Sequence, residues 1–79
     1  MAFFEFIWAD PVLEKLAERE ISPYDVEAII AKPEGQDVSR STGLPVAFGA
    51  LADGRFIIVV YRWIDQVTVQ PITAYEVPE

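Results

Sequence analysis

A run of large apolar residues from Phe56 to Tyr61 constrains the fold of this chain more than any other stretch. The run is rich in β-branched and aromatic side chains, which favour a packed strand. It is apolar at odd and even positions alike, a pattern typical of a strand that is covered on both faces. The segment Arg55–Trp63 is therefore predicted to be the central strand of a sheet, with another layer on each face.

The length and composition predict one small domain. The chain has 79 residues, of which 52% are hydrophobic, so residues 1–79 are expected to share one core. This hydrophobic fraction is high for a short chain and indicates that some apolar surface meets a partner. No apolar run approaches the roughly 18 residues that span a bilayer, and the N-terminus lacks the basic start of a signal peptide. We therefore expect a cytoplasmic protein without membrane association.

Cysteine and histidine are both absent from the sequence. Their absence excludes disulfides, Cys or His metal sites, and nucleophile arrangements that depend on Cys or His. The acidic residues do not follow the spacing of a metal-binding loop, so no metal or other cofactor is expected. The net charge is −7, from 13 acidic and 6 basic residues. This balance disfavours tight non-specific nucleic-acid binding and suits either a basic partner or simple solubility.

Cap and turn residues divide the chain into short elements. Asp10 and Ser22 are predicted helix N-caps, each followed by a proline at the first helical position. Pro33 is predicted to end the second helix. Strands are predicted at residues 3–8, 44–52, 55–63 and 67–74, the last with an edge or bulge at its proline. The polar segment between the second helix and residue 44 offers a further, optional edge strand at 38–41. The sequence thus predicts an α+β domain, in which a twisted antiparallel sheet of about four strands carries two short helices on one face.

The Asp53-Gly54 pair is typical of a two-residue hairpin turn. Such a turn pairs Phe48 with Val59 and makes both faces of the sheet apolar. Two short helices cover only one of these faces. The second face is predicted to curl on itself, to be covered by the N-terminal strand or the tail, or to meet another chain.

The order of a strand, two helices and an antiparallel sheet resembles the RelE/ParE toxin superfamily, and four motifs resemble its BrnT-like branch. The motifs are residues 6–11 (FIWADP), 19–27 (REISPYDVE), 53–61 (DGRFIIVVY) and 70–75 (QPITAY). Members of this family are usually toxins of type II toxin–antitoxin modules, which cleave messenger RNA and are neutralised by a DNA-binding antitoxin. The resemblance implies a RelE/ParE-like fold, RNA as substrate and a cognate antitoxin as partner.

The chain departs from the BrnT-like pattern at positions that such a ribonuclease uses. Arg19 and Glu20 stand where the family has His and Gly, and Gln70 and Tyr75 stand where its closing motif has arginines. RNA cleavage needs cations around the phosphate and a group that moves the 2′-hydroxyl proton. The resemblance therefore implies a toxin-like component, with an endoribonuclease of degenerate active site as one reading of it. The alternative is a non-catalytic interaction module, or a homo-oligomeric one, that works through its apolar sheet face.

The candidate site residues are basic and aromatic. Arg62 is predicted to act as a phosphate or carboxylate clamp, or else to cover the sheet edge with its stem and keep its head in water. The resemblance adds Arg19 and Tyr75 as catalytic candidates. The alternative for Lys15 and Arg19 is a solvated helix surface, and the alternative for Arg40 is a plain loop. Trp63 is otherwise a core or interface aromatic. The candidates for RNA contacts through charge or base stacking are Lys15, Arg40, Arg55 and Trp63.

Overall fold

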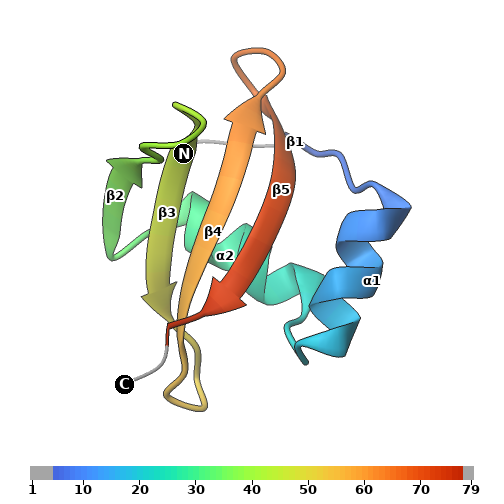
Figure 1. Ribbon diagram of the computed structural model, residues 1–79, viewed down its shortest axis with the longest axis vertical. Helices are drawn as coiled ribbons and strands as arrows, with labels where there is room; N and C mark the ends of the chain where they lie inside the picture. The colour runs from blue at the N-terminus through green and yellow to red at the C-terminus, as the bar shows by residue number, and fades with distance from the viewer. Residues whose placement is uncertain (1–4, 78–79) are drawn as a thin grey trace.

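Seven short elements make up the part of the chain that the computed structural model describes, residues 5–77. They are β1 (Glu5–Phe6), α1 (Asp10–Glu18), α2 (Pro23–Ala31), β2 (Gly35–Val38), β3 (Pro45–Ala50), β4 (Phe56–Trp63) and β5 (Thr68–Glu76). The strands form one sheet of order β1-β5-β4-β3-β2, in which only β1 and β5 pair in parallel (Figure 1). The predicted α+β class is confirmed, but the sheet is mixed and has five strands, because β1 adds a parallel edge to the antiparallel strands.

Helix α2 crosses one face of the sheet behind β3 and β4, and α1 lies beside β5 (Figure 1). Side chains from both helices, from the link between them and from β3, β4 and β5 meet in one core. The buried apolar residues of this core are Leu16, Ile21, Val26, Ile29, Ile30, Ala47, Ile57, Val59, Tyr61, Val69 and Ala74. Among the described residues, no helix is long and apolar enough to cross a membrane.

The two helix starts differ in their caps. Ser22 caps α2 as predicted, because its Oγ accepts a hydrogen bond from the Tyr24 N–H at 3.2 Å. In α1 the N-cap is Ala9 and its side chain makes no cap hydrogen bond. The prediction that Asp10 caps α1 is therefore wrong by one position: Asp10 is the first helical residue, where the helix dipole favours its negative charge.

Helix α1 ends in a Schellman motif that turns the chain toward α2. The Ile21 N–H donates to the Leu16 carbonyl at 2.9 Å, and the Glu20 N–H donates to the Ala17 carbonyl at 3.1 Å. Glu20 has a φ of 57°, in the left-handed region that glycine usually fills at this position. Ile21 and Leu16 are both buried, which is the apolar contact that accompanies this motif. The position at which the BrnT-like pattern has Gly is thus a left-handed helix terminus.

The hairpin between β3 and β4 has a three-residue loop, so the predicted two-residue loop is wrong. The Gly54 N–H donates to the Leu51 carbonyl at 3.0 Å, and the Leu51 N–H donates to the Arg55 carbonyl at 2.8 Å. Gly54 has a φ of 93°, so a tight turn is followed by a left-handed residue. The additional loop residue pairs Phe48 with Ile58 and moves every side chain of β3 to the face opposite the predicted one.

Other strand predictions change at their boundaries. β2 is Gly35–Val38 instead of 38–41, because the Ser39 N–H already bonds the Leu44 carbonyl at 2.8 Å and closes the following loop. The predicted first strand, 3–8, begins outside the described residues, and within them only Glu5–Phe6 pairs as a strand. Pro71 pairs next to a register shift between β4 and β5, so the predicted bulge is present.

Candidate functional site

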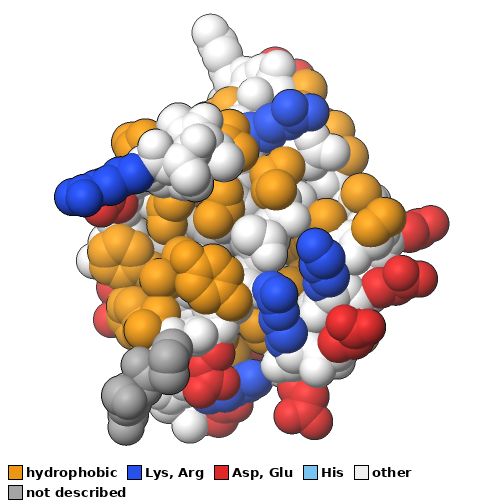
Figure 2. Space-filling view, viewed as in Figure 1, with side chains coloured by type: hydrophobic (Ala, Val, Ile, Leu, Met, Phe, Trp, Pro, Cys, Tyr) orange, Lys and Arg blue, Asp and Glu red, His pale blue; other side chains and the backbone are white. Residues whose placement is uncertain are grey.

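The sheet face opposite α2 carries a patch of partly exposed apolar side chains, which Figure 2 shows in orange. Along β4 these side chains alternate with the buried Ile57, Val59 and Tyr61. The central strand is therefore covered by a helix on one face only, and this helix-free face is the second face that the sequence left without a layer. We call it the open sheet face; its apolar residues are Val46, Phe48, Ala50, Phe56, Ile58, Val60 and Tyr75.

Two phenylalanine rings fix the shape of the open sheet face near β2. The rings of Phe48 and Phe56 have centroids 5.7 Å apart and are tilted by 47°. The Phe48 ring lies across Gly35, its cross-strand partner, so a Cβ atom at position 35 would overlap the ring carbons. A glycine at this position lets an aromatic side chain cover the edge strand, as in designed sheets. No local sequence pattern predicts this contact, because it depends on the β2–β3 register.

Arg62 lies on the same face, near the end of β4. Its Nε donates to Oε1 of Gln70 at 2.9 Å, and Gln70 is its cross-strand partner on β5. Arg62 is exposed and Gln70 is partly exposed. The neutral amide of Gln70 thus orients the Arg62 guanidinium, and Gln70 stands where the closing motif of the BrnT-like pattern has its first arginine. The pair presents one exposed positive charge beside the apolar patch.

Arg19 follows the end of α1, and its side chain reaches β5 on the β4–β5 side of the sheet. Its Nη1 donates to the Ala74 carbonyl at 2.7 Å and to Oγ1 of Thr73 at 3.3 Å. These contacts place the guanidinium at the edge of β5, beyond the two positions at which β1 pairs with that strand. The Ala74 carbonyl at the edge of β5 thus gains a charged donor, which also blocks pairing with a foreign strand there.

The three catalytic candidates therefore share the β4–β5 side of the open sheet face, where they belong to three successive cross-strand rows. Strand register places Arg62 opposite Gln70, Val60 opposite Thr73 with its Arg19 contact, and Ile58 opposite Tyr75. Tyr75 is 42% exposed, so its ring is accessible. Figure 2 shows Lys and Arg side chains around the orange patch on this face. The arrangement can bind an anion beside apolar surface.

The four candidates for RNA contacts are scattered. Trp63 projects to the helix side of the sheet, with its ring centroid 6.2 Å from that of Tyr61, and so does not share a face with Arg62. Lys15 is exposed in the last turn of α1 and Arg40 is exposed in the loop after β2. These positions do not form one continuous surface with Trp63.

Arg55, the fourth of these candidates, has contacts that stabilise the fold. Its Nη2 donates to the Glu20 carbonyl at 2.8 Å and its Nη1 donates to the Arg19 carbonyl at 3.3 Å. Its Nε forms an ion pair with Asp53 at 2.9 Å within the hairpin. Arg55 therefore joins the end of α1 to the β3–β4 loop, and its side chain is only 26% exposed.

The clear pKa shifts lie away from the candidate site. Hydrogen bonds from the Arg55 N–H and side chain lower the pKa of Asp53, and the Val67 N–H, followed by Thr68, lowers the pKa of Asp65. Burial raises the pKa of Tyr61, which faces the core. None of these three groups lies on the open sheet face. In residues 5–77 no group of three or more Asp or Glu side chains could hold a metal ion.

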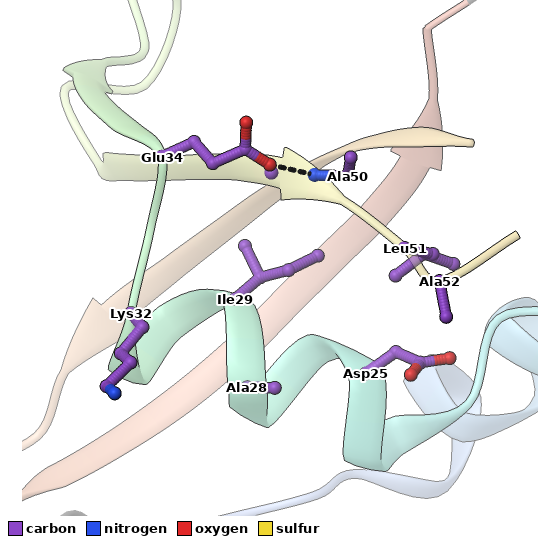
Figure 3. A pocket seen from close by; sticks show the side chains of 9 residues that line it. Asp25, Ala28, Ile29, Lys32, Glu34, Ala50, Leu51 and Ala52 are labelled. Atoms are coloured by element: carbon purple, nitrogen blue, oxygen red, sulfur yellow. Dashed lines mark hydrogen bonds between the residues drawn. The ribbon is translucent and has the colours of Figure 1, made fainter. Parts of the chain in front are cut away.

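A concave region with a volume of about 340 Å³ lies between α2 and β3 (Figure 3). Its floor is apolar, with Ile29 and Leu51, and its rim carries Asp25 and Glu34. The Glu34 carboxylate accepts a hydrogen bond from the Ala50 N–H, as Figure 3 shows. Glu34 directly precedes Gly35, the first residue of β2, and its carboxylate takes the place of a strand carbonyl as the acceptor for the Ala50 N–H. Its role is structural and depends on a long-range contact that the sequence does not reveal.

Comparison of the chain with protein-family models, with curated proteins and with solved structures found no match. The class of protein is therefore defined by the fold alone: a small α+β domain in which a five-stranded mixed sheet has one helix-free face. The BrnT-like resemblance therefore depends on the four sequence motifs alone and is not supported by a matching family model, protein or structure.

Proposed function

We propose that this protein is the toxin-like component of a type II toxin–antitoxin module and acts in the cytoplasm by binding a partner protein on its open sheet face. A RelE/ParE-like fold is part of this proposal. The observation that carries it is the open sheet face itself, where apolar side chains from β3, β4 and β5 remain partly exposed. Contiguous apolar surface of this kind marks a protein-binding site on small soluble domains.

Binding is favoured over catalysis by the chemistry at the margin of this face. Arg19 and Arg62 supply positive charge, but each is held by neutral oxygen acceptors on β5. The sequence has no histidine, and the groups with shifted pKa values lie elsewhere. A net charge of −7 also opposes the approach of a polyanion such as RNA.

Induced expression in a bacterial host, with and without the product of the neighbouring reading frame, tests this proposal. We expect the two proteins to co-purify, growth to slow only without the second protein, and RNA to stay intact. Ile58→Glu, in the middle of the open face, should abolish co-purification. Tyr24→Glu on α2 is the matched control, because Tyr24 is 81% exposed and lies away from this face. Equal loss in both variants, or no binding by the natural chain, would overturn the proposal.

A ribonuclease is the second candidate, and it is favoured by the presence of Arg19, Arg62 and Tyr75 on the same side of the open sheet face. On this hypothesis growth arrest is accompanied by messenger RNA cleavage. Arg62→Ala should then relieve both, because a cation near the phosphate stabilises the charge of the transition state. Arrest with intact RNA would exclude the ribonuclease and leave the binding function.

A further inference from the structure

We propose that a second copy of this chain occupies the open sheet face when no other protein does, with the two sheets packed face to face about a two-fold axis parallel to the strands. This inference rests on the proposed function, because it takes the same face as the binding surface. It adds the identity of one occupant and the geometry in which that occupant sits.

The open sheet face carries opposite charges at its two sides. Asp37 on β2 pairs with Val46, Val46 pairs with Val60, and Val60 pairs with Thr73 on β5. These four residues form one row across the sheet. An exposed carboxylate stands at one end of the row, and the Arg19 guanidinium, bonded to Thr73, stands at the other. The residues between the two ends are valines.

A two-fold axis between β3 and β4 exchanges β2 with β5 and β3 with β4. In an isologous contact of this kind each pairing occurs twice. Asp37 of each copy then faces Thr73 and Arg19 of the other. The valines of the row meet in the middle, so the charged ends are complementary and the centre is apolar. A partner of a single charge would match only one end of this row.

The adjacent row gives a second match under the same axis. It runs from Gly35 through Phe48 and Ile58 to Tyr75. The exchange places the exposed Tyr75 ring of one copy on the Phe48 ring of the other, where that ring crosses Gly35. Aromatic pairs contribute beyond their buried area. Packed sheets lie about 10 Å apart with strands aligned to within about 30°, a spacing that an aspartate and an arginine side chain can bridge.

Sedimentation equilibrium of the full chain tests this inference, with circular dichroism to confirm that each variant folds. We expect a dimer that Ile58→Glu converts to a monomer. Asp37→Lys should raise the dissociation constant of the dimer about tenfold, because two cations then face each other at both ends of the interface. Asp25→Lys makes the same charge change on α2, behind the sheet, and should alter it by no more than about twofold.

A charge reversal across the axis makes the test specific. Thr73→Asp added to Asp37→Lys should restore most of the lost affinity, since positions 37 and 73 face each other in the dimer. A monomeric natural chain, a dimer that Asp37→Lys leaves unchanged, or a double variant without recovery would overturn the inference. If the natural chain is a monomer that still binds a second protein of the module on this face, only the self-association inference is overturned and the proposed function stands. If the natural chain is a dimer that binds no other protein, only the proposed antitoxin partner is overturned and the self-association inference stands.

Discussion

Glu20 is a residue in a backbone conformation that suits glycine, and replacing it should stabilise the protein. It has a φ of 57° at the end of α1, where the Schellman hydrogen bonds to Leu16 and Ala17 fix it. A left-handed conformation costs an ordinary L-residue about 1–2 kcal/mol. Glycine avoids this cost but gives the unfolded chain additional freedom, which opposes folding by about 0.4–1 kcal/mol. The difference between these two ranges is about 0–1.6 kcal/mol, so Glu20→Gly should raise the free energy of unfolding by about 0.8 kcal/mol, the middle of that range.

Reversible thermal unfolding followed by circular dichroism measures this effect. For a domain of this size the gain corresponds to an increase of about 2–8 °C in Tm. The backbone carbonyl of residue 20 stays available to the Arg55 guanidinium, which bonds it at 2.8 Å, so the substitution preserves that contact.

Two control variants separate conformation from charge and from chain flexibility. Glu20→Gln removes the charge and keeps the unfavourable φ, so its Tm should stay close to that of the natural chain. Glu18→Gly places glycine inside the last turn of α1 and should destabilise the protein by about 1 kcal/mol. A Tm for Glu20→Gly that is equal to or below that of Glu20→Gln would refute the reasoning.

Three further predictions follow from contacts of the hairpin and the edge strand. Gly35→Ala should displace the Phe48 ring and lower the free energy of unfolding by about 1–3 kcal/mol, with a change in the near-ultraviolet circular dichroism. Arg55→Ala should cost about 1–3 kcal/mol in urea unfolding, because it leaves two carbonyls and Asp53 without a charged donor. Asp53 and Asp65 have folded pKa values below the ordinary 3.8, so their stabilising contribution is present above that pH and is lost as the pH falls through the folded values. Urea unfolding should therefore show weaker stability below about pH 4, and Asp53→Asn with Asp65→Asn should reduce that pH dependence.

The elements that the sequence predicts well depend on local signals. Ser22 and the proline after it define the start of α2, and the apolar run defines β4. The hairpin was predicted wrongly because an Asp-Gly pair is compatible with both a two-residue loop and a three-residue loop with a left-handed glycine. A difference of one residue moves Phe48 and its neighbours on β3 to the other face. Local pattern cannot choose between these loops, whereas packing of Ala47 beneath α2 can.

The candidate site was predictable only in part. The positions of Arg19, Arg62 and Tyr75 came from motif and strand pattern, and the fold brings them to one margin. The structural role of Arg55 was not predictable, because its acceptors lie 35 and 36 residues away in sequence. Glu34 was missed for the same reason, since its acceptor role depends on the register of β2 and β3.

The strand order has a consequence for synthesis of the protein. β5 comes after all six other described elements, yet it lies between β1 and β4 and contacts α1. A ribosome therefore exposes β1 and α1 long before the strand that holds them exists. Closure of this sheet must wait until β5 emerges, and contacts between such distant segments form slowly. The edge of β1 that later pairs with β5 is unprotected during that interval, which is when a chaperone or a co-translated partner has access to it.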